Sequence, residues 1–399
     1  MALGIYISVP FCRTKCSFCN FASDVFSKVL FEKYVDRVRA DIEAAPNLAR
    51  AMGGQFESEV DSIYMGGGTP TVLDAEQLRR IFDAVRARFS VLPDAEITVE
   101  CAPGTLSPAL LETMLACGVN RVSLGVQSFI DQEAAAVGRL HKRSTVIDDI
   151  SRLRETGISN INIDLIAGLP HQTAASWQES LSEAIATGVP HVSVYMLEID
   201  DDSRLGRELI AGGTRYHAHF VPEEDAVADF YVAACEGLET AGIPQYEISN
   251  FARPGLESRH NLKYWTRQPY FGFGVDAHSM LVSAKDSSEA VRLATADSLE
   301  KYTAGPFSKE TLVSHAAALE EVFFLGLRLN RGVDLSEVAR FDSELLGQVG
   351  PTISELIRQE LMQQECSFVH LTARGRLLSN EVFQRFLWAP EPMQDVAGD

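Results

Sequence analysis

One unit recurs along the first 250 residues and constrains the fold more than any other feature. It consists of a helical pattern, a glycine, a β-branched residue and then an apolar run, and it occurs at Gly118-Val119, Gly157-Ile158, Gly188-Val189 and Gly242-Ile243. Each glycine suits the left-handed residue that ends a helix. Repeated units of this kind predict a parallel sheet with helical crossovers, built either as an open doubly wound sheet or as a barrel.

Six short apolar runs are the candidate strands of this sheet. We expect most of them to be buried on both faces, as is typical of parallel strands. Between them, Asp74 suits the N-cap of a helix that reaches about Phe89, and Ser107-Pro108 suits an N-cap followed by proline at the first helical position. The runs are Leu3–Val9, Ser62–Met65, Ile97–Cys101, Val122–Val126, Asn160–Ile166 and His191–Leu197.

The pattern changes near Gly305-Pro306, which we predict to end a first domain over residues 1–305. Helical patterns over 312–330, 334–347 and 351–365 are followed by a β run at Ser367–Leu371 and a last helical stretch over 376–387. This order predicts a small winged-helix-like α+β domain over residues 306–390. Residues 391–399 are expected to form a loose tail.

The composition favours a cytoplasmic protein that does not bind nucleic acid. The 399 residues carry a net charge of −20, which the phosphate backbone would repel. The first residues, MALGIYISVPFC, lack the basic region and cleavage site of a signal peptide, and no apolar run approaches the roughly 20 residues of a membrane helix. We therefore expect contact with a membrane only through a partner protein.

Three cysteines stand close together directly after the first apolar run. Cys12, Cys16 and Cys19 have C-x3-C-x2-C spacing. Thiolates are soft ligands that suit iron–sulfur clusters or zinc, and three of them would leave one iron of a [4Fe–4S] cubane open. Zinc and unliganded cysteines are the alternatives. Structural zinc usually takes four ligands as two pairs, and no second pair is present in the sequence.

Polar residues end three of the other predicted strands. Glu100, Gln127 and Asp164 follow otherwise apolar runs, and the glycine-rich segment Gly66–Pro70 follows the second run. Burying such side chains without partners costs about 1–3 kcal/mol each, so they indicate a binding site. Three glycines let the backbone approach a ligand closely, although a plain turn is the alternative. Arg139 suits a carboxylate partner, or else a surface ion pair.

The segment from Tyr6 to Phe21, YISVPFCRTKCSFCNF, resembles the signature loop of the radical S-adenosylmethionine (SAM) superfamily. The resemblance implies a partial (β/α)6 TIM-like barrel and a [4Fe–4S] cluster on the three cysteines, with SAM chelating the open iron. It also implies an electron donor, whose electron passes through the cluster and cleaves SAM to methionine and a 5′-deoxyadenosyl radical.

The strings GVQSF and NIDLIAGLPHQT are similar to the oxygen-independent coproporphyrinogen III oxidase family. This closer resemblance extends in outline to a C-terminal domain of the HemN type. It implies that SAM is contacted by the residues at the matching positions, which are Tyr6, Phe18, Gly67, Gly68, Thr69, Glu100, Gln127, Arg139 and Asp164.

Two branches of that family differ at the residue that lies two positions after the third cysteine. The oxidase has a fourth cysteine there, whereas this chain has Phe21. The segment His260–Trp265, HNLKYW, resembles the H-N-x-x-Y-W motif of the haem chaperone branch, HemW. The resemblance therefore implies haem binding through His260, because imidazole is a common axial ligand of haem iron.

The neighbours of His260 suit a porphyrin. Tyr264 and Trp265 can form a flat aromatic wall, and Arg259 and Lys263 can meet the propionates. A packed histidine beside two aromatic residues is the alternative. His278 is expected near the SAM pocket rather than as a ligand, and the four other cysteines, Cys101, Cys117, Cys235 and Cys366, are expected to be structural thiols.

The function implied by the resemblance is that of a haem chaperone, which binds haem and transfers it to an acceptor haemoprotein. The resemblance also suggests a homodimer. Two alternatives remain open, and both are radical SAM enzymes. One is anaerobic oxidative decarboxylation of coproporphyrinogen III, and the other is radical chemistry on a different substrate.

Overall fold

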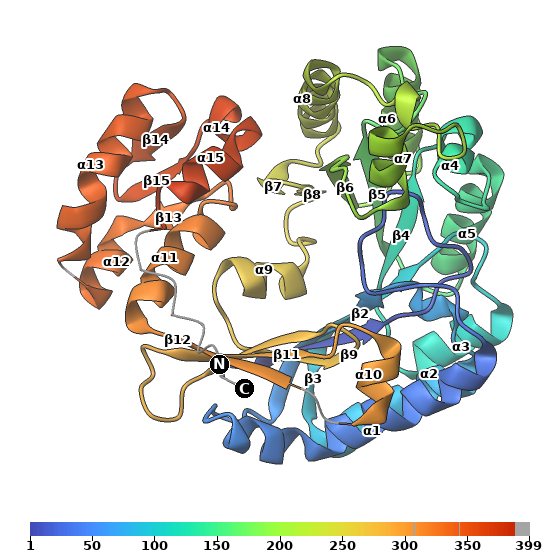
Figure 1. The fold of residues 1–399 in the computed structure, drawn as a ribbon, viewed down its shortest axis with the longest axis horizontal. Coiled ribbons are helices and arrows are strands. Elements are labelled where there is room, and N and C mark those ends of the chain that lie inside the picture. Colours follow the sequence, from blue (N-terminus) through green and yellow to red (C-terminus); the bar gives the residue numbers. More distant parts are fainter. Residues whose placement is uncertain (306–307, 343, 388–399) are drawn as a thin grey trace.

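Six parallel strands form the centre of the structure. The computed structural model describes residues 1–305, 308–342 and 344–387. Neighbouring strands pair in chain order, and Figure 1 shows the sheet curving around a central space with helices outside it. The predicted parallel α/β sheet is therefore confirmed as a partial barrel. Its strands are β1 (Leu3–Val9), β2 (Glu59–Gly67), β3 (Ser90–Cys101), β4 (Arg121–Gln127), β5 (Asn160–Ala167) and β6 (His191–Met196).

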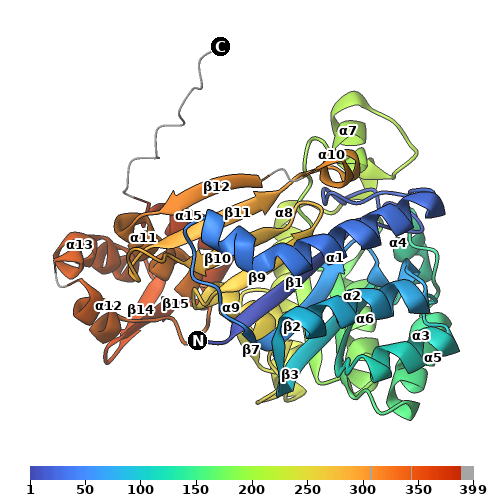
Figure 2. The same cartoon turned by 90° about the horizontal axis from the view of Figure 1, so that it is seen from below.

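Helices between these strands cover the outer face of the sheet (Figure 2). Asp74 and Ser107 cap two of them as predicted, accepting hydrogen bonds from Gln77 N and Leu110 N. All four predicted helix-ending glycines have positive φ, between 67° and 94°. The helices are α1 (Lys28–Ala51), α2 (Ala75–Arg88), α3 (Pro108–Ala116), α4 (Asp131–Ala136), α5 (Arg143–Glu155) and α6 (Ala174–Ala186), with a 3-10 turn η1 (Pro70–Val72).

The two faces of the parallel sheet differ in polarity. On β1, Ile5, Ile7 and Val9 are fully buried in the hydrophobic core, whereas the alternate residues Tyr6 and Ser8 line a pocket on the other face. The expectation that most of the strands are buried on both faces is confirmed, since β1, β4 and β5 are buried at nearly every position, but their inner face carries polar side chains. Side chains alternate along a strand with a period of two, so an apolar outer face is compatible with a polar inner face.

The sheet continues beyond the six parallel strands on both sides. Within the described residues it has twelve strands in the order β12-β11-β10-β9-β1-β2-β3-β4-β5-β6-β8-β7. Strand β9 is parallel to β1, and β10 to β12 are antiparallel. The added elements are α7 (Arg204–Ala211), η2 (Ala218–Phe220), α8 (Glu224–Thr240), β7 (Gln245–Glu247), β8 (Asn250–Ala252), α9 (Arg259–Trp265), β9 (Tyr270–Gly274), β10 (His278–Val282), β11 (Ala290–Thr295), α10 (Leu299–Ala304) and β12 (Ser308–Val313).

The C-terminal residues have a hydrophobic core of their own, which includes Phe323, Val369 and Phe386. The predicted helix over 351–365 is too long. It ends at Arg358, and 362–365 form a strand that pairs with β15 after a turn in which Glu360 has a φ of 58°. The elements are α11 (His315–Gly326), β13 (Val333–Asp334), α12 (Leu335–Phe341), α13 (Leu345–Arg358), β14 (Met362–Glu365), β15 (Phe368–Leu371), α14 (Ala373–Leu377) and α15 (Ser379–Gln384).

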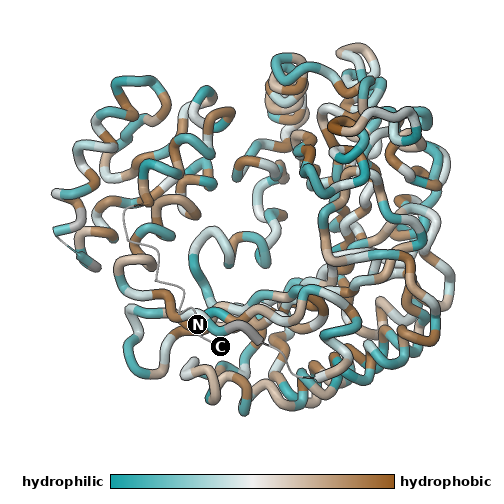
Figure 3. Tube along the Cα trace, in the orientation of Figure 1, coloured by the Kyte–Doolittle hydropathy of each residue, from teal (hydrophilic) through white to brown (hydrophobic). Residues whose placement is uncertain are grey.

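The predicted domain boundary near Gly305 stays a prediction, and the main sheet extends past it to Val313. The predicted tail over 391–399 lies outside the described residues. In the part of the chain that the structure describes, no helix combines the length and the apolar character needed to cross a membrane. Consistently, Figure 3 shows polar and apolar residues intermixed along the outer helices.

Candidate functional site

The three clustered cysteines lie in the loop that follows β1, and backbone hydrogen bonds hold this loop on two sides. On one side, Gly68 N donates to Val9 O at 2.7 Å and Thr69 N donates to Phe11 O at 2.7 Å. On the other side, Ser17 N donates to Val137 O at 3.2 Å. A Cβ on Gly68 would lie 2.7 Å from Phe11 O, so only glycine lets the segment after β2 approach this loop so closely.

The donor set fits a [4Fe–4S] cluster. Cys12, Cys16 and Cys19 are free thiols, and burial raises the pKa of Cys12 and Cys16, while the Arg139 guanidinium lowers that of Cys16. Among the described residues, no three His, Cys, Asp or Glu side chains converge on one point that would hold a single metal ion. A cubane distributes its thiolates over several irons, so three separated thiols of one loop suit it.

Glu100 contacts the glycine-rich segment Gly66–Pro70, whose first two residues are the last residues of β2. Tyr64 Oη donates to Glu100 Oε1 at 2.8 Å, and Gly67 N donates to Oε2 at 3.1 Å. Burial raises the pKa of Glu100 to about 7, against the lowering effect of the Tyr64 hydrogen bond. A Cβ on Gly66 would lie 2.7 Å from the Glu100 carboxyl carbon, so the glycine is required by this close contact.

Arg139 and Gln127 come together over Gly125, where a Cβ would lie 3.2 Å from Arg139 Nη2 and 3.3 Å from Gln127 Nε2. Gln127 has a φ of 70°, which is rare outside glycine. Within the described residues, Arg139 has neither an ion pair with a carboxylate nor a partner for its buried Nε. The predicted carboxylate partner is therefore not found, and the free donor suits an anionic ligand group.

The other predicted SAM residues lie around the same region. Asp164 accepts hydrogen bonds from Ser123 Oγ at 3.0 Å and Asn162 Nδ2 at 2.7 Å, and burial raises its pKa. Thr69 Oγ1 donates to Cys12 Sγ at 3.8 Å. Phe18 packs on a hydrophobic cluster formed by Val137, Ile166 and Leu169.

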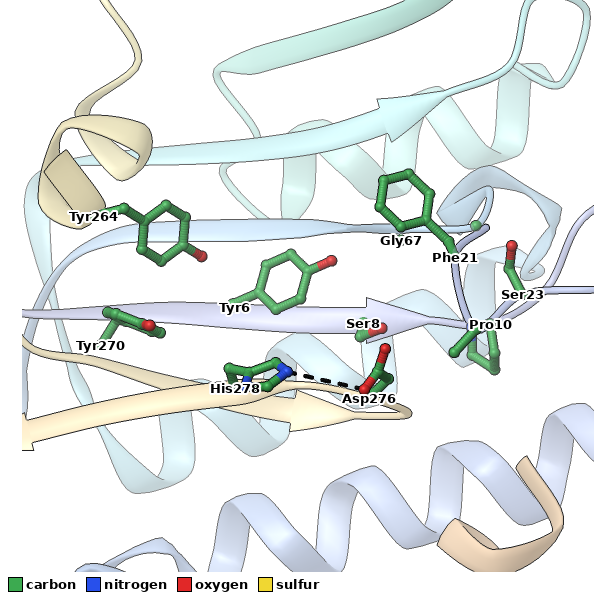
Figure 4. A pocket seen from close by; sticks show the side chains of 12 residues that line it. Tyr6, Ser8, Pro10, Phe21, Ser23, Gly67, Tyr264, Tyr270, Asp276 and His278 are labelled. Carbon is green, nitrogen blue, oxygen red and sulfur yellow. Dashed lines mark ion pairs between the residues drawn. The ribbon is translucent and has the colours of Figure 1, made fainter. Parts of the chain in front are cut away.

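A pocket of about 290 Å³ joins this region to the segment that resembles the haem motif. Tyr6, Gly67 and Gly68 line one part of it, and Tyr264 of α9 lines another. Figure 4 shows Tyr264 and Phe21 at opposite ends of the pocket, with Tyr6 between them. The loop that carries the cysteines and the motif helix, 240 residues apart in the chain, therefore face one cavity. His278 lines it too, as expected.

His260 is buried beside this pocket and has partners for both ring nitrogens. Its Nδ1 is hydrogen-bonded to Ser62 Oγ at 3.0 Å, and its Nε2 to the Tyr264 hydroxyl at 2.9 Å. Only 1% of the residue is exposed, and burial lowers its pKa to about 3. In this conformation His260 holds Tyr264 in position and offers no free nitrogen.

The remaining motif residues do not form the predicted arrangement. The rings of Tyr264 and Trp265 are inclined at 67°, so they present no common flat wall, and Trp265 packs under the Arg328 guanidinium. Lys263 pairs with Asp61 at 2.8 Å, and Arg259 Nη1 donates to Asp94 O at 2.6 Å. Both cations are thus already engaged by the protein rather than free for propionates.

Sequence reasoning missed the residues that anchor the motif helix and complete the pocket. Glu96 accepts hydrogen bonds from Arg259 N at 3.0 Å and His260 N at 3.1 Å, and thereby caps α9. Tyr270 and Asp276 line the pocket. The alternation of polar and apolar residues along the strands could have indicated Glu96, but nothing in the sequence places it beside residue 260.

Comparison with known proteins agrees with the family resemblance of the sequence. The radical SAM superfamily model matches residues 6–184, and the HemN C-terminal domain model matches residues 313–378. The chain is 33% identical to heme chaperone HemW of Bacillus subtilis, with 96% of this chain and 98% of that protein covered. It is 35% identical to heme chaperone HemW of Synechocystis, with 85% and 81% covered.

Among solved structures, coproporphyrinogen III oxidase (HemN) from Escherichia coli, a radical SAM enzyme, has a similar fold. The TM-score is 0.81, and the match covers 96% of this chain and 90% of that one. The sequence identity is 23%, so this likeness shows the fold alone.

Proposed function

The chain belongs to the HemW family of radical SAM proteins, and on this basis we propose that it binds haem and transfers it to an acceptor haemoprotein. The observation that carries the proposal is the pocket shared by the loop after β1 and the motif helix α9. Tyr6, Tyr264 and Tyr270 line that pocket and offer aromatic surface to a planar ligand. Haem and the SAM site would therefore be neighbours.

The three thiolates of Cys12, Cys16 and Cys19 would hold a [4Fe–4S] cluster, which in its reduced state supplies the electron that cleaves the SAM sulfonium. The protein's own residues would bind SAM. Glu100 offers a buried carboxylate beside the glycine-rich segment, and Arg139 offers an unpaired buried donor. The matching positions Tyr6, Phe18, Gly67, Gly68, Thr69, Gln127 and Asp164 complete the proposed SAM site.

His260 as a ligand of haem iron stays a prediction, and the structure defines what it requires. Tyr264 would have to leave Nε2, or Ser62 would have to leave Nδ1. Tyr264 contributes to the pocket wall as the structure stands, whereas Trp265 would reach a haem only after leaving Arg328. An electron donor, a homodimer and a cytoplasmic location also belong to the proposal.

The oxidase is the less supported alternative. Phe21 stands where the oxidase branch has its fourth cysteine, and its side chain is an exposed part of the pocket wall. A phenyl ring cannot ligate iron or carry a proton. The position therefore adds aromatic surface to the pocket and no acid–base or redox group.

The test is a haemin titration of the anaerobically reconstituted protein, followed by absorbance in the Soret region. We expect saturable binding of one haemin per chain and subsequent transfer to apomyoglobin, used as a stand-in acceptor. A parallel sample receives coproporphyrinogen III, SAM and a reductant. Conversion to protoporphyrinogen without haemin binding would overturn the proposed function in favour of the oxidase.

A further inference from the structure

We propose that an acidic electron-carrier protein docks on the cysteine loop, on the side that faces away from the pocket, and reduces the cluster from there. The inference rests on the proposed [4Fe–4S] cluster and names the surface through which its electron enters. The reduced partner loses one electron, the cluster gains it, and no atom is transferred. Residues 21–23 of the loop line the pocket, and the docking surface lies outside that lining. This surface, which we call the donor face, consists of Arg13, Lys15, Leu140 and Lys142.

The donor face lies directly against the part of the loop that carries the cysteines. Thr14 Oγ1 donates to Gly138 O at 2.9 Å, and a Cβ on Gly138 would lie 3.9 Å from the Cα of Cys16. Leu140 and Lys142 follow on the same segment, between α4 and α5. Electron transfer becomes much slower as the distance grows, so a partner that covers this face is well placed to reduce a cluster on the thiolates.

Arg13 connects the loop to the start of α5. Its Nη1 donates to Gly104 O at 3.2 Å, and a Cβ on Gly104 would lie 3.2 Å from Thr145 Cγ2 in the first turn of that helix. Lys142 is the N-cap residue of the same helix. In Figure 1 the loop, in dark blue, passes beside α5. Two cations therefore lie at one helix N-terminus, whose dipole adds to the positive potential.

The cations of the donor face have no anionic partner, although the chain carries a net charge of −20. Among the residues that the structure describes, no carboxylate forms an ion pair with Arg13, Lys15 or Lys142. The carboxylate of Asp24, which belongs to the same loop, faces Arg204 at 3.8 Å instead. Unpaired basic side chains favour an acidic partner, because opposite charges speed the encounter of two proteins and orient them.

Leu140 supplies an apolar contact among these charges. Its side chain is 72% exposed, whereas Val137 and His141 of the same segment are buried. Complexes that transfer electrons have small, transient interfaces, so they need little apolar area. One exposed leucine with basic residues around it suits a partner that binds briefly and leaves after the transfer.

The other side of the loop is acidic and limits where such a partner can dock. Three exposed aspartates stand at 200–202, and Asn20 Nδ2 donates to Asp200 Oδ2 at 3.4 Å. These carboxylates repel an acidic protein. The charges on the two sides of the loop therefore direct it to the side of Arg13 and Lys142.

The test follows reduction of the anaerobically reconstituted protein by chemically reduced flavodoxin, an acidic one-electron flavoprotein, in a stopped-flow instrument. We expect Lys142→Glu to lower the second-order rate constant about tenfold at low salt and about twofold or less at about 0.5 M salt, because salt screens exposed charges. Leu140→Gln should weaken the binding of oxidised flavodoxin, measured by titration calorimetry, about fivefold at both salt concentrations. Equal rate constants for Lys142→Glu and wild type at low salt would overturn the proposal.

Lys285→Glu is the matched control and should react like wild type. Lys285 is also an exposed lysine that forms no ion pair among the described residues. It follows Ala284, whose N–H donates to Gly53 O just beyond the last residue of α1. Since α1 begins directly after the cysteine loop and has 24 residues, about 36 Å of helix separates Lys285 from the donor face.

Reduction by dithionite separates this inference from the cofactor on which it rests, because a small reductant needs no docking surface. Dithionite should reduce wild type, Lys142→Glu and Leu140→Gln at similar rates. If it does not reduce wild type, the proposed cluster fails together with the donor face. If dithionite reduces all three and flavodoxin does not distinguish them, only the donor face is wrong. Slower haem transfer to apomyoglobin by Lys142→Glu, with unchanged reduction by flavodoxin, would assign the surface to the haem acceptor instead.

Discussion

Replacing Glu96 by alanine should release the motif helix α9 from the sheet. The carboxylate of Glu96 accepts hydrogen bonds from the backbone N–H groups of Arg259 and His260, at 3.0 and 3.1 Å. These are among the first N–H groups of a helix, which have no partner inside it. The carboxylate also carries negative charge at the positive end of the helix dipole. Glu96 is 6% exposed, so water cannot easily replace it.

The free-energy cost of Glu96→Ala follows from the loss of these two hydrogen bonds. A buried donor left without a partner costs about 1–3 kcal/mol, so two such donors cost about 2–6 kcal/mol. We expect about 3 kcal/mol for Glu96→Ala, because truncating the side chain also lets some water reach the helix end. Glu96→Gln keeps one acceptor oxygen and should lose about half as much.

Hydrogen exchange on the backbone of 259–265 measures this loss directly. A fall of about 3 kcal/mol in the free energy of local opening corresponds to roughly a hundredfold loss of protection. Asp94→Ala is the matched control, since Asp94 lies nearby, is 77% exposed and pairs with Arg259 at 3.6 Å. Such an exposed pair is worth about 0–1 kcal/mol. Equal protection in Glu96→Ala and Asp94→Ala would refute the reasoning.

Three further predictions concern the proposed cofactor sites and the packing of β9. Cys16→Ser should lose the cluster signal in electron paramagnetic resonance and fall short of about four irons per chain, while Cys366→Ser, at an exposed cysteine elsewhere, should retain both. The affinity for SAM should fall about tenfold per pH unit below the Glu100 pKa of about 7, because protonation removes the negative charge of the carboxylate and turns one of its two acceptor oxygens into a donor. Equilibrium dialysis between pH 6 and 8 should show this slope in wild type, whereas Glu100→Gln should bind SAM more weakly and with an affinity that does not depend on pH. A wild-type affinity that is equally independent of pH would contradict the role of Glu100. Gly274→Ala should lower the melting temperature, because its Cβ would overlap the Ser8 carbonyl oxygen at a φ of 102°, whereas Gly305→Ala, with nothing within 4 Å of the added Cβ, should melt like wild type.

The six parallel strands were predictable because their signals are local. A short apolar run is visible within a few residues, and for β4, β5 and β6 a left-handed glycine ends the preceding helix. The segment Tyr270–Gly274, YFGFG, has buried apolar residues at Phe271 and Phe273 but is only five residues long and follows no helix-ending glycine. Glycine is required at Gly272 because the backbone of β10 approaches it, and at Gly274 because the backbone of β1 approaches it. Strand β1 lies about 265 residues earlier in the chain. Such non-local pairings leave no periodic trace in the sequence.

The candidate site was predictable where a residue type has distinctive chemistry. Three closely spaced cysteines and a carboxylate at a strand end indicate a site by themselves, and in the structure Glu100 accepts a hydrogen bond from Gly67 N of the glycine-rich segment. The environment of His260 was not predictable, because Ser62 is 198 residues away in the chain. A motif shows which residues are present, whereas burial and hydrogen-bond partners depend on the whole fold.

One chain of contacts links the two halves of the pocket. Glu100 accepts from the Tyr64 hydroxyl at 2.8 Å, the Tyr64 ring stacks on His260 at 5.4 Å, and His260 is hydrogen-bonded to Tyr264 at 2.9 Å. A ligand that changes the ionisation of Glu100 changes the strength of the first hydrogen bond in this chain. Coupling between two binding sites is reciprocal, so a SAM that alters haem affinity through Tyr64 must have its own affinity altered by haem to the same extent. The short path from Glu100 to Tyr264 therefore makes Tyr64→Phe the variant in which such coupling would be lost while both sites keep their other contacts.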